Sequence, residues 1–340
     1  MKVLITGVTG QDGAILADKM HQEGYEVFGG FRRGAQNSWR MRELALTHSL
    51  RFVNYDATDT STIDYLISSH KFDYVYHFAG SSYTVDSLNF PQNTLMTNIN
   101  GSVSLLEAIR KYSPNTQVFL AGSSEIFKRN SGSSKLLVDE LSALEPTNPY
   151  GVSHLALRSL AQIYREQHNL SITLGIFFNH ESKFRSLQFV TRKISHGMAE
   201  IKLRNSEALT LGNFSAMRDW GCAVEFMHGT QLLTEKRVSS DVVLATGSHF
   251  SVRDLIRVSA QTVGFDPVFA VENKTEKCLD GTSGRLLAIS DYRFFRSGDT
   301  APIVGDVTRL EDFINWKPSR SIESVIEEMT IEDLKRVEKE

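Results

Sequence analysis

A hydroxyl, a carboxylate and a phenol near the middle of the chain have the chemistry needed to move protons during an oxidation or a reduction. Ser123 and Glu125 directly follow an apolar run that predicts a buried strand. Tyr150 begins a helical pattern, and His154 follows it one turn later, so the two side chains share one face of the helix. Each residue alone is weak evidence, because serines at strand ends and tyrosines at helix starts are mostly structural. Their gathering at the carboxyl edge of a parallel sheet is what would make a catalytic site.

A glycine-rich loop lies where the strand predicted at Val3–Thr6 meets the first helix. The loop has the spacing GxxGxxG, not the GxGxxG of many dehydrogenases, and reads Gly7, Val8, Thr9, Gly10, Gln11, Asp12 and Gly13. Small residues allow a tight turn and let a pyrophosphate approach the helix N-terminus, where free N–H groups favour an anion. A glycine turn without a ligand is the alternative, but strand, turn and helix in this order favour a dinucleotide. A nicotinamide bound there would make Ser123, Glu125 and Tyr150 a hydride-transfer centre.

The end of the second predicted strand, which includes Glu26-Val27-Phe28, indicates which dinucleotide would bind. Arg32 and Arg33 stand where NAD-binding chains carry an acidic residue for the ribose 2′-hydroxyl, and an arginine there accommodates a 2′-phosphate. NADP is therefore favoured over NAD, the alternative being a pair of solvated surface arginines. Further cofactor contacts are expected at the ends of the third and fourth strands, namely from Asp56, Ala57, Phe78, Ala79, Gly80 and Ser82.

The first half of the chain alternates short apolar runs with helix-like stretches, which predicts an α/β fold with a doubly wound, Rossmann-type parallel sheet. A long helix is expected to follow Asn148 as its N-cap and to run from Pro149 to about His168, with a strand next at Ser171–Phe177. Beyond Asn179 the rhythm loosens, with helices expected near 188–199, 219–234, 252–263 and 321–337 and strands near 209–211 and 241–245. We expect residues 1–180, with a returning segment at about 212–246, to form the cofactor domain. A smaller substrate-binding region would comprise 181–211 and 247–340.

Composition excludes several classes of protein. The 340 residues carry 37 basic and 40 acidic side chains, a formal net charge of −3, so no basic surface for nucleic acid is expected. No apolar run reaches the roughly 18 residues of a membrane span, and the first residues are predicted to belong to the fold and not to a signal peptide. Cys222 and Cys278 cannot build a disulfide framework and lie in no metal-ligand cluster, which favours a reducing cytoplasm and no metal.

The sequence resembles the extended short-chain dehydrogenase/reductases and, within them, the GDP-mannose 4,6-dehydratases. Matching blocks follow in family order from residue 3 to about 230, with weaker matches at Gly305-Asp306 and Trp316-Lys317-Pro318. The blocks are the glycine loop, Arg32-Arg33, Ser123-Ser124-Glu125, Asn148-Pro149-Tyr150, Phe178 to Ser182, Phe189 to Ile194, Leu211-Gly212-Asn213 and Arg218 to Gly221.

The resemblance implies an internal redox sequence at a nucleotide sugar. A hydride leaves C4 of the hexose for NADP+, water is lost across C5 and C6, and the hydride returns to C6. Tyr150 would take the C4 hydroxyl proton, Ser123 would hydrogen-bond that oxygen, and Glu125 would handle the C5 proton and the leaving C6 hydroxyl. Positions matching cofactor contacts are Tyr150, His154, His180 and Arg185; those matching contacts of a GDP-hexose are Ser82, Ser123, Glu125, Asn179, Lys193 and Arg218. Family members also pair through helix faces, which implies a homodimer or homotetramer.

This chain departs from the family at the catalytic helix. The pattern Tyr-x-x-x-Lys is here Tyr150 to His154, and a largely uncharged imidazole supplies less help to the tyrosine than an ammonium. Lys183-Phe184-Arg185 also replaces Pro-Arg-Arg. Three readings remain open: a 4,6-dehydratase, another step on a GDP-sugar such as epimerisation, reduction or dehydration of a modified sugar, and a cofactor-binding paralogue with impaired catalysis. Retained Glu125 favours dehydration, because a simple reductase has no use for a base at C5.

Overall fold

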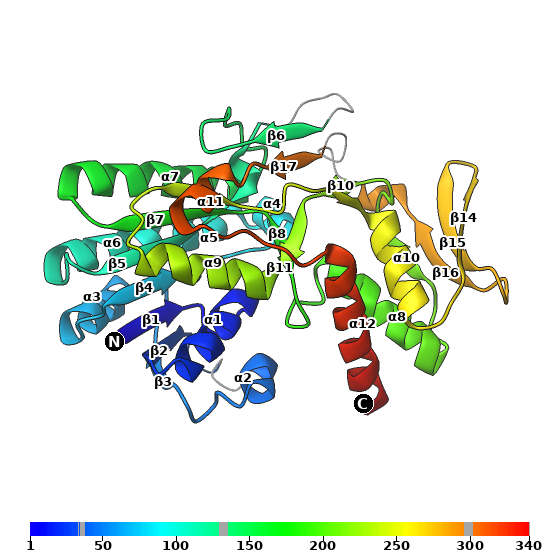
Figure 1. The fold of residues 1–340 in the computed structure, drawn as a ribbon, viewed down its shortest axis with the longest axis horizontal. Coiled ribbons are helices and arrows are strands. Elements are labelled where there is room, and N and C mark those ends of the chain that lie inside the picture. The colour runs from blue at the N-terminus through cyan, green and yellow to red at the C-terminus, as the bar shows by residue number, and fades with distance from the viewer. Residues whose placement is uncertain (33, 35–37, 129–134, 296–301, 340) are drawn as a thin grey trace.

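A seven-stranded parallel sheet forms the centre of the larger part of the molecule (Figure 1). The computed structural model describes residues 1–32, 34, 38–128, 135–295 and 302–339; Arg33 of the predicted arginine pair therefore lies outside the described residues. The strand order is β12-β7-β5-β4-β1-β2-β3, and every neighbouring pair runs parallel. In chain order these strands are β1 (Lys2–Thr6), β2 (Glu26–Phe31), β3 (Arg51–Asn54), β4 (Tyr74–His77), β5 (Gln117–Ser123), β7 (Ile172–Phe177) and β12 (Asp241–Leu244). This is the doubly wound Rossmann-type architecture that the alternating pattern predicts.

Helices cover both faces of this sheet, so its central strands are apolar on both sides. One face packs against α3 (Thr60–Ser69), α6 (Gly101–Tyr112) and α7 (Pro149–His168). The other packs against α1 (Gln11–Gln22), α9 (Ala223–Glu235) and α11 (Thr308–Ile314). Short helices complete this part: α2 (Trp39–Glu43), α4 (Thr84–Asn89), α5 (Pro91–Leu95), the π-helical turn η1 (Met96–Asn100) and the 3₁₀ turn η2 (Ser124–Ile126). The carboxyl ends of β1, β4 and β5 thereby meet at one edge of the sheet.

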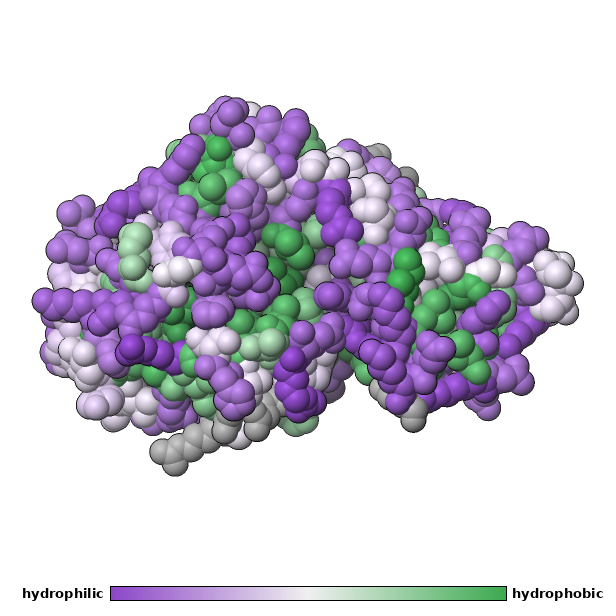
Figure 2. All heavy atoms as spheres, turned by 60° about the horizontal axis from the view of Figure 1, so that its bottom comes forward, coloured by the Kyte–Doolittle hydropathy of each residue, from purple (hydrophilic) through white to green (hydrophobic). Residues whose placement is uncertain are grey.

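A smaller part has its own hydrophobic core. It combines α8 (Val190–Arg204), α10 (Val252–Thr262) and α12 (Ile322–Lys339) with a four-stranded sheet. The strands of that sheet are, in spatial order, β14 (Pro267–Glu272), β15 (Thr275–Asp280), β16 (Leu286–Ser290) and β9 (Leu209–Leu211), and the 3₁₀ turn η3 (Tyr292–Phe294) follows β16. The surface is notched between the larger and the smaller part (Figure 2).

Three two-stranded pairs connect distant segments. They are β8 (Asn179–Glu181) with β11 (Trp220–Cys222), β10 (Met217–Arg218) with β13 (Phe250–Ser251), and β6 (Leu136–Val138) with β17 (Ile303–Gly305). The helix expected near 219–234 begins later, at Ala223, because the preceding residues pair with β8 as β11. The helix expected near 188–199 runs further, to Arg204. None of the helices in the described ranges combines the length and apolar character required to cross a bilayer.

Candidate active site

Ser123, Glu125 and Tyr150 lie together at the carboxyl edge of the sheet. Asn148 caps α7 through its Oδ1, which accepts the Gly151 N–H at 2.9 Å, and its Nδ2 donates to Glu125 Oε2 at 3.0 Å. One amide therefore fixes both the helix that carries Tyr150 and the carboxylate. A side chain at position 151 would come within 2.6 Å of the Glu125 carbonyl oxygen, so glycine there allows α7 to pack this closely on η2.

Burial governs the protonation of Tyr150 and His154. Desolvation raises the pKa of Tyr150 to about 12, although a hydrogen bond with Ser123 opposes the shift. Desolvation also lowers the pKa of His154 to about 4, so its imidazole is neutral at pH 7. The two rings stand 4.4 Å apart between centroids. Burial thus holds the pKa of Tyr150 above the ordinary tyrosine value of about 10, and the neutral His154 supplies no positive charge to lower it.

His154 also has an open ring nitrogen. The imidazole makes one hydrogen bond to the backbone of Ala121 at the end of β5. Its Nδ1 is buried and has no hydrogen-bond partner among the described residues. A buried polar atom without a partner costs free energy, so its retention beside the sheet edge points to a ligand group. A ribose hydroxyl of a nicotinamide dinucleotide has the donor that this nitrogen lacks.

The glycine loop forms a cradle that only small residues fit. Gly7 has φ +68°, and a Cβ there would lie 2.8 Å from the backbone nitrogen of Ala79. At Gly13 a Cβ would lie 2.5 Å from the Gly7 carbonyl oxygen. Gly10 is the N-cap of α1 and no side chain caps the helix. The loop therefore offers an uncapped helix N-terminus to an anion, as the sequence predicts.

Two polar residues of this loop are engaged by the protein itself. Gln11 donates to the His180 carbonyl oxygen at 3.1 Å and accepts a hydrogen bond from Ser182 Oγ at 2.8 Å. Asp12 pairs with His180 Nε2 at 3.0 Å, while the other ring nitrogen of His180 contacts the Phe178 carbonyl oxygen at 2.7 Å. Gln11, Asp12 and His180 thus join the loop to β8, and their contacts with a cofactor stay a prediction.

The contact between Asp12 and His180 favours the charged form of both groups. Burial raises the pKa of Asp12, but the His180 cation outweighs it and brings the value to about 2. Burial likewise lowers the pKa of His180, and the Asp12 carboxylate reverses the direction to a net rise. A protonated His180 offsets the negative charge of Asp12 in the glycine loop, where that charge alone would repel a phosphate.

The remaining predicted cofactor residues surround the loop. Arg32 is exposed after β2, and its charge acts on Asp56 after β3, whose carboxylate accepts two hydrogen bonds from Thr58, at 2.9 and 2.7 Å. Ala57 is buried, and its Cβ would lie 2.7 Å from a Cβ at Gly101. Four positions form the edge after β4: Phe78, Ala79, Gly80 and Ser82, of which Gly80 and Ser82 are exposed.

Arg185 reaches the centre of the site from the segment after β8. Its Nε lies 3.1 Å from Glu181 Oε2, and its guanidinium covers the Phe189 ring at 3.5 Å. Its charge lowers the pKa of both Asp12 and Tyr150. The guanidinium is therefore close enough to the glycine loop and to Tyr150 for its charge to act on both.

The candidate sugar-nucleotide residues are more dispersed. Asn179 lies in β8, opposite Trp220 of β11. Lys193 is exposed on α8, and its Nζ donates to the Thr210 carbonyl oxygen at 3.1 Å. Arg218 lies in β10, and its Nη1 donates to the Met217 carbonyl oxygen at 2.8 Å. The Lys193 and Arg218 side chains thus bond to backbone carbonyls of two different segments.

The comparisons with known proteins agree with this geometry. A model of the family "GDP-mannose 4,6 dehydratase" matches residues 4–329. The chain belongs to this family. A GDP-mannose 4,6-dehydratase of Vibrio cholerae is 32% identical over 352 residues, covering 98% of this chain and 94% of that protein. Another, of Sordaria araneosa, is 33% identical over 98% of this chain, but this chain spans only 61% of its length.

Solved structures share the fold of this family member. RMD of Pseudomonas aeruginosa, complexed with NADPH, has a TM-score of 0.75 at 18% identity and covers 98% of this chain and 99% of that one. The dTDP-glucose 4,6-dehydratase of Bacillus anthracis, in complex with NAD, has a TM-score of 0.79 at 16% identity, with coverage of 100% and 98%. At these identities the likeness concerns the extended short-chain dehydrogenase/reductase fold.

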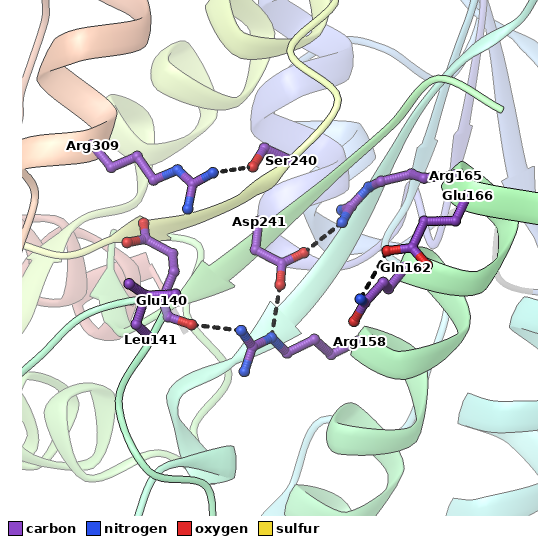
Figure 3. A pocket seen from close by; sticks show the side chains of 9 residues that line it. All are labelled: Glu140, Leu141, Arg158, Gln162, Arg165, Glu166, Ser240, Asp241 and Arg309. Carbon is purple, nitrogen blue, oxygen red and sulfur yellow. Dashed lines mark hydrogen bonds and ion pairs between the residues drawn. The ribbon is translucent and has the colours of Figure 1, made fainter. Parts of the chain in front are cut away.

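A separate hollow of about 330 Å³ lies away from the family's site, beside the first residue of the edge strand β12 (Figure 3). Asp241 there pairs with Arg158 at 2.7 Å and with Arg165 at 2.9 Å, and Arg309 donates to Ser240 at 2.5 Å. Three arginines and three carboxylates line it, the latter being Glu140, Glu166 and Asp241. The charges balance, and the cluster serves to fasten α7 to the sheet edge.

Sequence reasoning missed several residues that shape this family member's site. Asn148 was expected as a helix cap, but nothing local indicates its second bond to Glu125. Asn98, in the π-helical turn, donates to the Ser81 carbonyl oxygen at 3.2 Å and to Ser153 Oγ at 2.9 Å. Asn98 thus links the loop after β4 to α7. The π-helical turn that carries it is typical of functional sites, but it is visible only in the structure. Within the described residues no group of three histidine, cysteine or acidic side chains could hold a metal ion.

Proposed function

We propose that this protein is an NADP-dependent 4,6-dehydratase of a GDP-hexose such as GDP-mannose, forming the 4-keto-6-deoxy sugar. Family membership supports a nucleotide-sugar dehydratase. The observation that carries the proposal is the fixing of Glu125 by Asn148 beside Ser123 and Tyr150. An oxidoreductase acting at C4 alone has no need of a carboxylate held at this place.

The residues divide the proton transfers between them. Tyr150 takes the proton of the C4 hydroxyl, and Ser123 hydrogen-bonds the same oxygen as it becomes a carbonyl. NADP+ held by the glycine loop would supply the hydride acceptor at C4 and the hydride donor at C6. The C4 ketone acidifies C5–H, so Glu125 can remove this proton and deliver it to the leaving C6 hydroxyl as water. With the hydride at C6, C5 takes a proton from solvent and Tyr150 gives up to solvent the proton that it took from the C4 hydroxyl, which restores both groups.

The proposed cofactor fits residues of this chain. Gly7 and Gly13 leave room for a pyrophosphate at the start of α1, and His154 Nδ1 has an unmet hydrogen bond. Arg32 would pair with the 2′-phosphate that distinguishes NADP from NAD. For the substrate, Lys193 and Arg218 would face the diphosphate and Asn179 the sugar end of the nucleotide. Residues 1–180 with 212–246 would hold the cofactor, and 181–211 with 247–340 the nucleotide sugar.

We further propose a homodimer or homotetramer in the cytoplasm. Apolar side chains are exposed on neighbouring helices, Leu88, Phe90 and Met96 before α6 and Val152 on α7, which suits a second copy. Both cysteines are buried and unpaired, as suits a reducing compartment. Light scattering on the purified protein tests the assembly, and a monomer at micromolar concentration would contradict it.

Incubation with nucleotide sugars tests the proposed reaction. Purified protein is supplied with NADP+ and, separately, GDP-mannose, UDP-glucose and dTDP-glucose, and products are followed by NMR in D₂O. The expected result is a 4-keto-6-deoxy product from the GDP-hexose alone, with deuterium at C5. Turnover of the UDP or dTDP sugar in its place would refute the choice of base. Glu125→Gln serves as the control that retains the fold.

A second candidate rests on His154. With a neutral imidazole and a Tyr150 pKa of about 12, the site supports slow proton removal at pH 7. A paralogue that binds cofactor and nucleotide sugar without turnover fits this observation. It predicts that both ligands raise the Tm of the protein while no product forms between pH 7 and 10.

A further inference from the structure

The segment that carries Arg185 is held by an unusual set of contacts. Each of the three consecutive carbonyl oxygens at 183–185 accepts a hydrogen bond from an arginine. Arg192 Nη1 donates to the carbonyls of Lys183 and Arg185, both at 2.9 Å. Arg40 Nε donates to the carbonyl of Phe184 at 2.6 Å, and Arg336 Nη1 donates to that of Lys183 at 3.1 Å. The backbone of this segment is therefore fixed from three helices, α2, α8 and α12.

One aromatic ring gathers the three arginines. The guanidinium carbons of Arg40, Arg336 and Arg192 lie 4.7, 5.0 and 5.5 Å from the centre of the Trp39 ring. Phe184 packs on the same ring at 5.9 Å and is buried. Arg40 also donates to the Thr9 carbonyl oxygen at 3.2 Å, so this cluster reaches the glycine loop. We call Trp39, Arg40, Phe184, Arg192 and Arg336 the tryptophan cage.

Three cations this close repel one another unless anions are present, and the central anion comes from the last helix. Asp333 of α12 is fully buried, and its carboxylate receives both Nε and Nη2 of Arg192 at 2.7 and 2.6 Å. It also accepts from Ser195 Oγ at 2.7 Å and from Arg336 at 3.1 Å. The two-pronged pairing fixes the plane of the Arg192 guanidinium, and with it the direction of the N–H groups that hold the 183–185 carbonyls.

We propose that Asp333 is a positioning residue for cofactor binding, acting through Arg192 on the segment that holds Arg185 against Glu181 and Phe189. The inference rests on one part of the proposed function, the binding of NADP. It assumes that Arg185 contacts this cofactor, because Asp333 would affect binding through Arg185. Without the carboxylate, Arg192 turns away from the carbonyls of Lys183 and Arg185, and only Arg40 and Arg336 still hold the segment. Arg185 then loses its fixed place over Phe189 near Asp12, and the site binds a pyrophosphate dinucleotide less tightly.

Binding of NADP+ to the full chain tests this, with titration calorimetry as the readout and no turnover required. Asp333→Asn keeps the shape of the side chain and removes its charge, and we expect the Kd for NADP+ to rise tenfold or more. The matched control is Asp241→Asn, which removes a carboxylate that likewise pairs two arginines, Arg158 and Arg165, in the hollow at the far end of the sheet. This control destabilises the fold but should change the Kd less than twofold.

Coupling to Arg185 separates positioning from loss of stability. In an Arg185→Gln background, Asp333→Asn should raise the Kd by less than a further twofold, because the group it positions is already absent. Hydrogen exchange in a peptide spanning 182–189 should rise in Asp333→Asn and not in Asp241→Asn. If Asp333→Asn does not fold, Arg192→Lys takes its place. This variant keeps the positive charge but cannot make the two parallel hydrogen bonds of the guanidinium, and it should raise the Kd for NADP+ to a similar extent.

Three outcomes would overturn the inference: an unchanged Kd in Asp333→Asn, an equal rise in Asp241→Asn, or a full additional loss in the Arg185→Gln background. A wild-type protein that binds neither NADP+ nor NAD+ would overturn it as well. Failure of the proposed function is distinguishable, because it appears as normal cofactor binding by the wild type with no 4-keto-6-deoxy product.

Discussion

Replacing His154 by lysine should raise the rate of product formation near neutral pH and shift its pH dependence. With a pKa of about 12, the phenolate form of Tyr150 amounts to roughly one part in 10⁵ at pH 7, so the wild-type rate should climb about tenfold per pH unit into the alkaline range. The rings of residues 150 and 154 are 4.4 Å apart. A full positive charge at about that distance, at an effective dielectric constant of about 20, stabilises the phenolate by roughly 4 kcal/mol, or two to three pH units.

The predicted increase in rate requires that the lysine introduced at position 154 is protonated. Burial lowers the pKa of His154, whereas the carboxylate of Glu125 acts to raise it. The same carboxylate would help to keep a lysine ammonium protonated. The expected rate gain at pH 7 is therefore about a hundredfold or more, and it should vanish above the wild-type pKa of Tyr150. His154→Gln is the matched neutral control, because it retains hydrogen-bonding groups without adding charge.

The assay is product formation at saturating cofactor and nucleotide sugar from pH 6 to 10, for wild type and both variants. A wild-type profile that is flat from pH 7 to 9, and unmoved in the lysine variant, would refute the reasoning. It would mean that another cation activates Tyr150, with Arg185 the first to test because its charge already lowers the pKa of Tyr150. A slower lysine variant would instead mean that the imidazole is fitted to a role which an ammonium cannot perform.

Three further expectations concern the cofactor, the carboxylate and stability. Arg32→Ala should weaken NADP+ at least tenfold in a titration while barely changing NAD+, because a charge-assisted pair is worth roughly 1.5–3 kcal/mol; equal losses would refute the role of Arg32. Glu125→Gln should bind both ligands normally and accumulate reduced cofactor without releasing product, and wild-type turnover would show that Glu125 is not the C5 base. Because the pKa of His180 is raised in the folded protein and that of Asp12 is lowered to about 2, their pair stabilises the fold above about pH 4 and loses this contribution as pH rises through the His180 pKa. His180→Asn should accordingly lower the Tm more at pH 6 than at pH 9, and an equal loss at both would contradict the charged pair.

Local patterns were sufficient to predict the sheet and the ends of its strands. The glycine loop is readable because a strand, a tight turn and a helix follow one another without interruption. The shared face of Tyr150 and His154 follows from helical spacing alone. The hairpin of β14 and β15 escaped prediction for an equally local reason. Its turn consists of Asn273 and Lys274, with positive φ angles of 49° and 66°. The second position of such a turn is usually glycine, so a lysine there gives no turn signal in the sequence.

The contacts that fix the site join residues far apart in the chain. Asp333 is 141 positions from Arg192, and Arg40 is 144 from the Phe184 carbonyl that it holds. Such pairs have no periodic signature, since a charged residue in a helix looks the same whether it is solvated or buried against a distant partner. The amide of Asn148 is similar: its capping role is visible in sequence, but its bond to Glu125 depends on how α7 packs against η2.

The two departures from the family pattern differ in their physical consequences. Phe184 stands in place of an arginine, yet it is buried against Trp39, so the substitution exchanges a charge for packing and the cage still holds the backbone of the segment. His154 replaces a lysine without comparable compensation, because its ring is neutral and one nitrogen lacks a partner. Phe184→Arg should therefore mainly change stability, by inserting a fourth cation beside three others, whereas His154→Lys should mainly change rate. If instead Phe184→Arg raised the rate at constant Tm, the missing cation of this site would be the one lost at 184, and the argument from the catalytic helix would fail.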